Sequence, residues 1–297
     1  MKKITLLAMS FLTALFVNAQ NGTDVTDQFV NADFEAGNSN GWTISGPTQV
    51  QNLQTQNTAA ANGYQGTYFQ EAWIGDQLND FNWSQTQDMP NGVYVVKALA
   101  HAIKQGSDVI PVGVYVYAEN QQTAVTSTSA TEYTVLAEVT DGNLTIGYRG
   151  QGFVANWVGC DDFRIMQYLA GTTGEAIALY AEDAFAELSE YHYQSSLSDR
   201  MNASIASLRT AATWAAAEPL WNSFKSLLAE ANLSIAAYER LMKAIGVAIE
   251  ESEKEYDEGL DAFEAAINEA QNYYDNALGD VAGVDAAIAK LADAQFD

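Results

Sequence analysis

The sequence predicts two structural units: an all-β antiparallel sandwich of the jelly-roll type, followed by an all-α bundle of repeated helical hairpins. Two changes along the 297 residues predict this order. Apolar residues recur with a period of two over residues 21–169, and with a period near 3.6 from residue 174 onward. Glycine is frequent in the first stretch and rare in the second. We therefore expect a β-sandwich at 21–169 and a helical domain at 174–297.

The first residues have the pattern of a cleaved secretory signal. Lys2 and Lys3 precede an apolar run over residues 4–17, and Val17-Asn18-Ala19 resembles a cleavage site. The run is shorter than the ~20 apolar residues that a membrane-spanning helix needs, and no cysteine directly follows it for lipid attachment. We expect residues 1–19 to be a signal peptide, and the protein to be secreted, extracellular or at the cell surface, without membrane insertion or a lipoprotein anchor.

The β half shows alternation between strong turn signals. Val114 and Val116 share one face of a predicted strand, with Tyr115 and Tyr117 on the other. Asn91-Gly92 and Asp141-Gly142 mark tight turns, because these residue types tolerate a positive φ. No helical pattern separates the strands, so the connections are those of an antiparallel sandwich.

The helical half repeats apolar stripes at helical spacing. The stripe from Trp221 to Ala231 returns at Leu260 to Ala270, an offset of 39 residues, which predicts repeated hairpins. Ser234 is a plausible N-cap for a separate fourth helix. Only Gly259 interrupts residues 250–275, so we expect one long rod there. The sequence predicts an acidic helical spacer, and we leave open that its repeats belong to a longer array.

Charge excludes one class of partner. The chain has 38 acidic and 13 basic residues, a net charge of −25. Nucleic acid and anionic membrane surfaces both select basic patches, which this composition cannot supply. We expect no nucleic-acid partner. Most of the acidity solvates the helices and says little about a ligand of the β half.

Three segments of the β half stand in a recognisable order. An opening run over residues 30–37 leads into Gly41-Trp42, a central Gly92-Val93-Tyr94 strand follows, and the segment 144–165 comes last. This order resembles carbohydrate-binding modules with the galactose-binding-like jelly-roll fold, with 144–165 as the last two strands. The helical half is similar in texture and repeat length to the FIVAR-type helical repeats of secreted sugar-active proteins. The resemblance implies binding to a polysaccharide or other glycan.

A sugar site needs an aromatic platform beside amides or charged groups. The polar stretch before the central strand and the glycine-rich loop before the last strand offer that mixture. The resemblance also places an amide that contacts sugar just before the last strand, where Asn156 stands. The expected ligand-binding residues are Tyr64, Trp73, Trp83, Arg149, Phe153 and Asn156.

The resemblance further implies a structural calcium ion. In the family, a Glu of the opening motif and an Asp of the closing motif hold it, and Glu35 and Asp161 are the matching residues. Calcium prefers several oxygen ligands, so two carboxylates on neighbouring strands are chemically suitable.

We expect no catalytic residues. The sequence has no G-x-S-x-G elbow and no H-E-x-x-H helix. Asp161 and Asp162 are adjacent on a strand and so point to opposite faces, which prevents them from flanking one glycosidic bond.

The predicted function is a secreted, non-catalytic carbohydrate-binding protein, whose helices carry the module or engage an enzyme or surface protein. Two alternatives stay open: a structural or adhesive cell-surface module that binds protein, and the N-terminal accessory part of a longer glycoside hydrolase.

Overall fold

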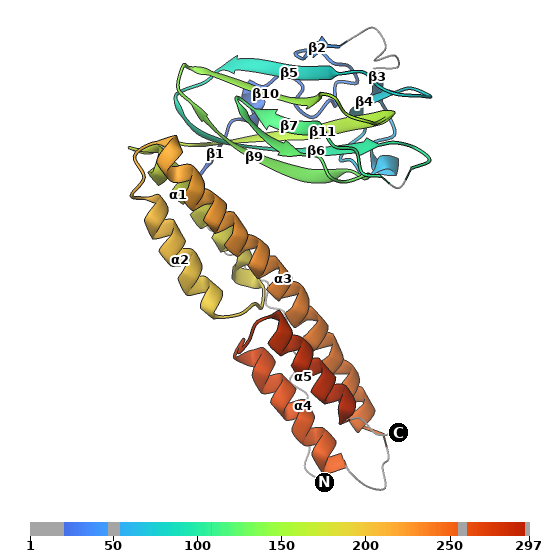
Figure 1. Ribbon diagram of the computed structural model, residues 1–297, viewed down its shortest axis with the longest axis vertical. Coiled ribbons are helices and arrows are strands. Elements are labelled where there is room, and N and C mark those ends of the chain that lie inside the picture. Colours follow the sequence, from blue (N-terminus) through green and yellow to red (C-terminus); the bar gives the residue numbers. More distant parts are fainter. Residues whose placement is uncertain (1–20, 47–53, 108, 255–259, 295–297) are drawn as a thin grey trace.

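The computed structural model describes residues 21–46, 54–107, 109–254 and 260–294 (Figure 1). A β-sandwich is followed by helices, which confirms the predicted fold class. The signal peptide predicted at residues 1–19 lies outside the described residues. No described helix has the length and apolar character that a membrane crossing requires.

The sandwich consists of two antiparallel sheets. The six-stranded sheet has the order β3-β4-β11-β6-β9, with β1 paired to β11, and the five-stranded sheet has the order β2-β5-β10-β7-β8. The strands are β1 Thr23–Asp24, β2 Thr43–Ser45, β3 Gln54–Gln56, β4 Phe69–Trp73, β5 Phe81–Asp88, β6 Gly92–Ile103, β7 Val114–Ala118, β8 Gln121–Ala124, β9 Thr131–Val139, β10 Asn143–Gly150 and β11 Trp157–Tyr168.

The predicted alternation fills the space between the sheets. Val114 and Val116 of β7 and Ile146 and Tyr148 of β10 point inward and are buried in one apolar core. The residues between them therefore point to the outer face of the five-stranded sheet. Short 3₁₀ turns lie outside the strands at Thr26–Gln28, Ala60–Asn62 and Glu187–Glu190.

The helices form two groups along one long helix. The hairpin of α1 (Thr173–Ala186) and α2 (Ser196–Leu208) packs on the first part of α3 (Trp214–Ser252), and α4 (Leu260–Asp275) and α5 (Val281–Asp293) pack on its second part (Figure 1). Two predicted helix boundaries are wrong. Ser234 lies inside α3, where its hydroxyl accepts a hydrogen bond from the Gln194 N–H (2.9 Å) instead of capping a helix. The rod expected over 250–275 is not continuous, because α3 ends at Ser252 and α4 packs against it.

The sandwich and the first helical group share an apolar core. Val93, Val95 and Leu136, on the outer face of the six-stranded sheet, pack with buried residues of α1, α2 and α3. Thr172 and Glu175 form a capping box that starts α1 directly after β11. The helices therefore cover part of the outer face of the six-stranded sheet, and the five-stranded sheet lies on the far side of the sandwich (Figure 1).

Candidate functional site

Two aromatic residues expected in the ligand platform are core residues. Trp83 is fully buried, with its ring centroid 4.9 Å from that of Phe81 and 5.4 Å from that of Tyr148. Phe153 meets the edge of Phe81 at 5.4 Å and is also buried. Both predictions are wrong because β5 turns Phe81 and Trp83 inward, and Phe153 closes that end of the core.

Tyr64 is also unavailable to a ligand. Its ring stacks on Phe69 at 4.5 Å, and its hydroxyl hydrogen-bonds to Nδ1 of His101 in the interior. Burial raises the pKa of Tyr64 well above its ordinary value and lowers the pKa of His101 to about 3. Both groups are therefore neutral, and the segment that carries Tyr64 covers one end of the outer face of the six-stranded sheet.

Asn156 organises loops instead of presenting an amide to solvent. Its Oδ1 accepts from the backbone N–H of Gln105 at 2.7 Å, and its Nδ2 donates to the carbonyl of Ile74 at 3.1 Å. The side chain is buried, so it is not accessible for the expected contact with sugar. It joins the segments that follow β4 and β6.

The two remaining residues lie on opposite outer faces of the sandwich. Trp73, which is 39% exposed, stands opposite Trp157 in the β4–β11 ladder, and its indole N–H donates to Oε1 of Gln105 at 2.9 Å. Arg149 lies between buried Tyr148 and Gly150 of β10, on the outer face of the five-stranded sheet. The six residues therefore do not form one site.

Arg149 belongs to a row of polar side chains that crosses the five-stranded sheet. Strand pairing places Ser45 opposite Asn82, Asn82 opposite Arg149 and Arg149 opposite Tyr115. A second row runs from Thr43 through Ser84, Gly147 and Tyr117 to Gln122. We call this surface the polar face; its central residues are Ser45, Asn82, Tyr115, Tyr117, Gln122 and Arg149.

Its centre is a fixed arrangement of one cation, one ring and two amides. The Arg149 guanidinium carbon lies 4.8 Å from the centroid of the Tyr117 ring, and the guanidinium hydrogen-bonds to the side-chain oxygen of Gln122. The Tyr117 hydroxyl donates to Oδ1 of Asn82 at 2.8 Å. These contacts hold Arg149 in place on the polar face.

Gly147 lets the Tyr117 ring lie close to the sheet. A Cβ at this position would stand 2.6 Å from Cε1 of Tyr117 and 2.3 Å from the carbonyl oxygen of Trp83. Only glycine avoids both overlaps, so the sequence of β10 is adapted to this ring position.

The polar face opens into a cavity of about 350 Å³ at one end. Ser45, Asp80, Asn82, Arg149 and Gln151 contribute to its lining. Asp80 is fixed by the backbone N–H of Gly152, 2.7 Å from its Oδ1. Hydroxyl, carboxylate, amide and guanidinium groups thus surround one opening, which is suitable for a ligand with many hydroxyl groups.

Sequence reasoning missed most of the polar face, although a signal for it existed. The alternation in 114–118 separates the two outward-facing tyrosines from the core-facing valines, and Asn82, Ser84 and Thr86 alternate with buried residues of β5. Which of the two faces of each strand is open follows only from the packing of the sheets.

The predicted calcium ligands lie near one another. Burial is the main cause that raises the pKa of Asp161 to about 8, and the carboxylates of Asp162, Glu35 and Asp33 act in the same direction. Oδ1 of Asp161 accepts from the Asp162 N–H at 2.8 Å, whereas Oδ2 finds no hydrogen-bond partner among the described residues. Glu35 accepts from the N–H groups of Thr67 and Tyr68 at 2.7 and 2.9 Å.

This environment is compatible with a cation but does not enclose one with side chains. A buried carboxylate oxygen without a donor, beside other acidic groups, suits a bound cation. In the part of the chain that the structure describes, no group of three or more His, Cys, Asp or Glu side chains is placed to hold a metal. Backbone carbonyls would have to complete the ligand set.

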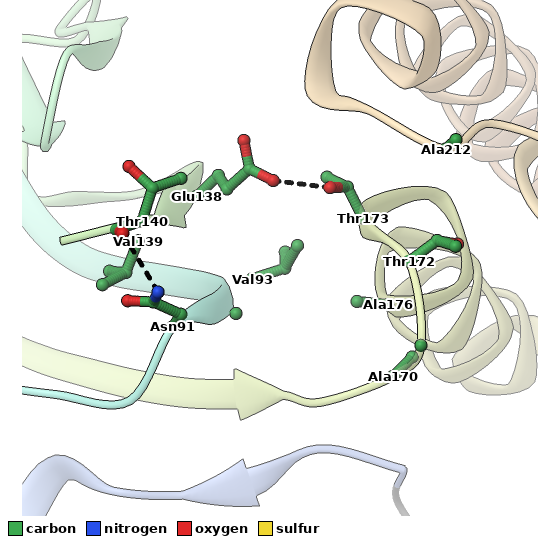
Figure 2. Close-up of a pocket in the computed structure, with 12 residues that line it drawn as sticks. Asn91, Val93, Glu138, Val139, Thr140, Ala170, Thr172, Thr173, Ala176 and Ala212 are labelled. Carbon is green, nitrogen blue, oxygen red and sulfur yellow. Dashed lines mark hydrogen bonds between the residues drawn. The ribbon is translucent and has the colours of Figure 1, made fainter. Parts of the chain in front are cut away.

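A cavity of about 280 Å³ lies where the sandwich meets α1 (Figure 2). Figure 2 shows the Thr173 hydroxyl bonded to Glu138 and the Asn91 amide bonded to the carbonyl of Thr140. Asn91 also accepts from the N–H of Gly142 at 2.9 Å. Because these groups engage one another, we interpret this cavity as part of the junction.

Comparison with solved structures finds similar proteins whose matches cover about half of this chain. A CBM61 carbohydrate-binding module in complex with β-1,4-galactotriose is 21% identical, with a TM-score of 0.39, and the match covers 47% of this chain and 97% of the module. The CBM22-1 xylan-binding domain from Paenibacillus barcinonensis Xyn10C is 18% identical, with a TM-score of 0.36, covering 47% and 94%. A cyclase from Fischerella sp. TAU is 13% identical, with a TM-score of 0.38, covering 51% and 100%. No protein-family model matches the sequence, and no curated protein matches it significantly.

Proposed function

We propose that this protein binds a glycan, without catalysing its cleavage, through the polar face. The observation that carries the proposal is the Arg149–Tyr117 pair with the amides of Asn82 and Gln122 beside it. Sugar hydroxyls need several donors and acceptors at fixed positions, and their C–H faces pack on aromatic rings. Tyr115, half-buried and opposite Arg149, supplies the ring that a sugar can reach.

Preorganisation supports this assignment. Ordering a long arginine side chain on binding costs free energy, and the cost is smaller when the free protein already holds the side chain. Arg149 has two partners in place, Tyr117 and Gln122. A ligand that accepts a hydrogen bond from the guanidinium would therefore meet a donor of fixed orientation.

Trp73 is the competing contact surface within the same function. It is the half-exposed member of the Trp73–Trp157 pair on the other outer face. A tryptophan face can carry a sugar by itself, so substitution of Trp73 and of Arg149 separates the two surfaces.

The experiment is affinity electrophoresis of the purified protein in gels that contain galactan, xylan, glucan or mannan. At least one polymer should retard the wild-type protein, and Arg149→Gln and Tyr115→Ala should lose most of that retardation. Arg164→Gln is the matched control, because Arg164 is an exposed arginine with carboxylate partners on the other outer face. If only Trp73→Ala loses retardation, the binding site lies on the six-stranded sheet instead. If no polymer retards the wild-type protein, the proposed function is wrong.

The helices would hold the module away from whatever anchors the protein. A helix of 39 residues such as α3 is about 58 Å long at 1.5 Å per residue. The shared core fixes its first part to the sandwich, which favours a rigid spacer for a secreted or cell-surface protein. An enzyme or surface-protein partner would bind the second helical group. The adhesive and accessory-domain alternatives differ from this proposal only in the ligand of the polar face and in the domain to which the helices connect.

A non-catalytic role agrees with where the perturbed groups lie. His101 is buried beside Tyr64 and Trp157, and its low pKa keeps it neutral. Asp161 is buried below the surface of the same sheet. Neither group lines the polar face, where a reacting sugar would sit in this proposal.

We also propose that Asp161 and Glu35 hold a structural calcium ion. When bound, the ion would neutralise a carboxylate that is costly to bury as an anion. EDTA should lower the melting temperature of the wild-type protein and leave that of Asp161→Asn unchanged. An equal melting temperature of the wild-type protein with and without EDTA discards the calcium site.

A further inference from the structure

We infer that the ligand of the polar face is an extended neutral glycan, and that its chain continues past β8 into a groove between the sandwich and α3. This inference rests on the proposed function and adds a second site to it. The groove has a volume of about 270 Å³ and is lined from both structural units. The residues that matter to the argument are Gln122, Tyr180, Trp214, Glu218, Asn222 and Lys225.

One face of α3 supplies aromatic and polar groups to this groove. Trp214, Glu218, Trp221 and Lys225 follow one another at spacings of three or four residues, so they share a helix face. Trp221 is buried and packs at 5.2 Å on Tyr180 of α1, whereas Trp214 is only half-buried. The groove therefore has an accessible indole on a fixed aromatic base.

The polar groups of the groove are available. Lys225, Glu218 and Asn222 are exposed, and among the described residues no acidic side chain forms an ion pair with Lys225. An indole beside a free ammonium, a carboxylate and an amide is the same mixture that the polar face presents.

Gln122 connects the two surfaces. It accepts the hydrogen bond of Arg149 on the polar face and also lines the groove. It stands on β8, the edge strand of the five-stranded sheet, which lines the groove together with β9. From β2 to β8 the polar rows extend about 19 Å, at ~4.8 Å per strand, so a ligand that follows them to the groove must be a chain of several sugars.

The charges favour a neutral chain. Glu218 and Lys225 balance one another at the groove, and Asp80 and Arg149 do so at the cavity of the polar face. A polyanionic polysaccharide would therefore meet no excess of cations at either place.

A length series of neutral oligosaccharides, prepared from the polymer that retards the wild-type protein, tests the inference by calorimetry. The affinity of the wild-type protein should rise with chain length beyond the size that fills the polar face. Trp214→Ala should weaken the longest ligand about tenfold and leave the shortest unchanged. Lys225→Ala should weaken the longest ligand less, and Lys243→Ala, an exposed lysine of α3 in the second helical group, is its matched control.

Three results would decide. A smaller length dependence in both groove variants, with short-chain affinity and melting temperature kept, supports the inference. If both groove variants bind every oligosaccharide as tightly as the wild-type protein does, and Arg149→Gln binds more weakly, the groove is not a binding site. The proposal for the polar face would then still hold. If the wild-type protein binds no oligosaccharide, both the groove and the proposed function are wrong.

Discussion

The two outer faces of the sandwich differ in what covers them. On the six-stranded sheet, the segment with Tyr64 lies over one end and the helices pack on Val93, Val95 and Leu136 at the other. On the five-stranded sheet, the polar residues of β5, β7 and β10 face outward. In our proposal, the first face contributes stability and the second contributes side chains for binding. Substitutions should therefore have opposite consequences on the two faces.

The largest expected effect lies in the core that the covered face shares with the helices. Phe224 of α3 is fully buried there, and Phe224→Ala should lower the free energy of unfolding by about 3–5 kcal/mol. Ser84→Ala on the polar face should change it by less than about 0.5 kcal/mol. Urea unfolding followed by circular dichroism measures both, and equal losses would contradict the division of roles.

Acid should loosen the end of the covered face that holds His101. Burial lowers the pKa of His101 to about 3, below the value of about 6.5 in an unfolded chain. The folded state thus favours the neutral ring, so this contribution is complete above pH ~6.5 and is lost as the pH falls toward 3.

The slope from this one group approaches about 1.4 kcal/mol per pH unit. His101→Gln should remove this pH dependence. The measurement is the difference in unfolding free energy between the variant and the wild-type protein from about pH 6.5 to pH 3. A difference that does not vary with pH would show that His101 is accessible to protons in the folded state.

Gly147→Ala should disturb the polar face from within. The added methyl group overlaps the Trp83 carbonyl and the Tyr117 ring, which should cost about 1–3 kcal/mol of stability and displace Tyr117 from Arg149. Glycan retardation should fall although no side chain that contacts the ligand is removed. Gly142→Ala, at a turn where a Cβ meets nothing within 4 Å but φ is +82°, is a control that strains the backbone away from the polar face.

Alternation alone was enough to predict the sandwich, because core-facing and outward-facing residues of β7 and β10 differ in type. It did not identify the face that we propose for binding: the sequence offers Trp83 as a platform residue and not Tyr115, yet the sheet packing buries Trp83 and leaves Tyr115 half-buried. The roles of Ser234 and Asn156 depend on hydrogen-bond partners that lie close in space but 40 and 51 residues away in the sequence. Such distant pairings depend on the assembled fold, so local sequence patterns could not predict them.

The most direct test of the central claim compares the two faces in one calorimetric titration with the longest oligosaccharide that binds. The account predicts that Arg149→Gln weakens binding about tenfold, the loss of a hydrogen bond to a charged donor, with an unchanged melting temperature, and that Arg164→Gln and Trp73→Ala bind like the wild-type protein. Wild-type affinity in Arg149→Gln, together with lost binding in Trp73→Ala, would place the ligand on the six-stranded sheet and contradict it.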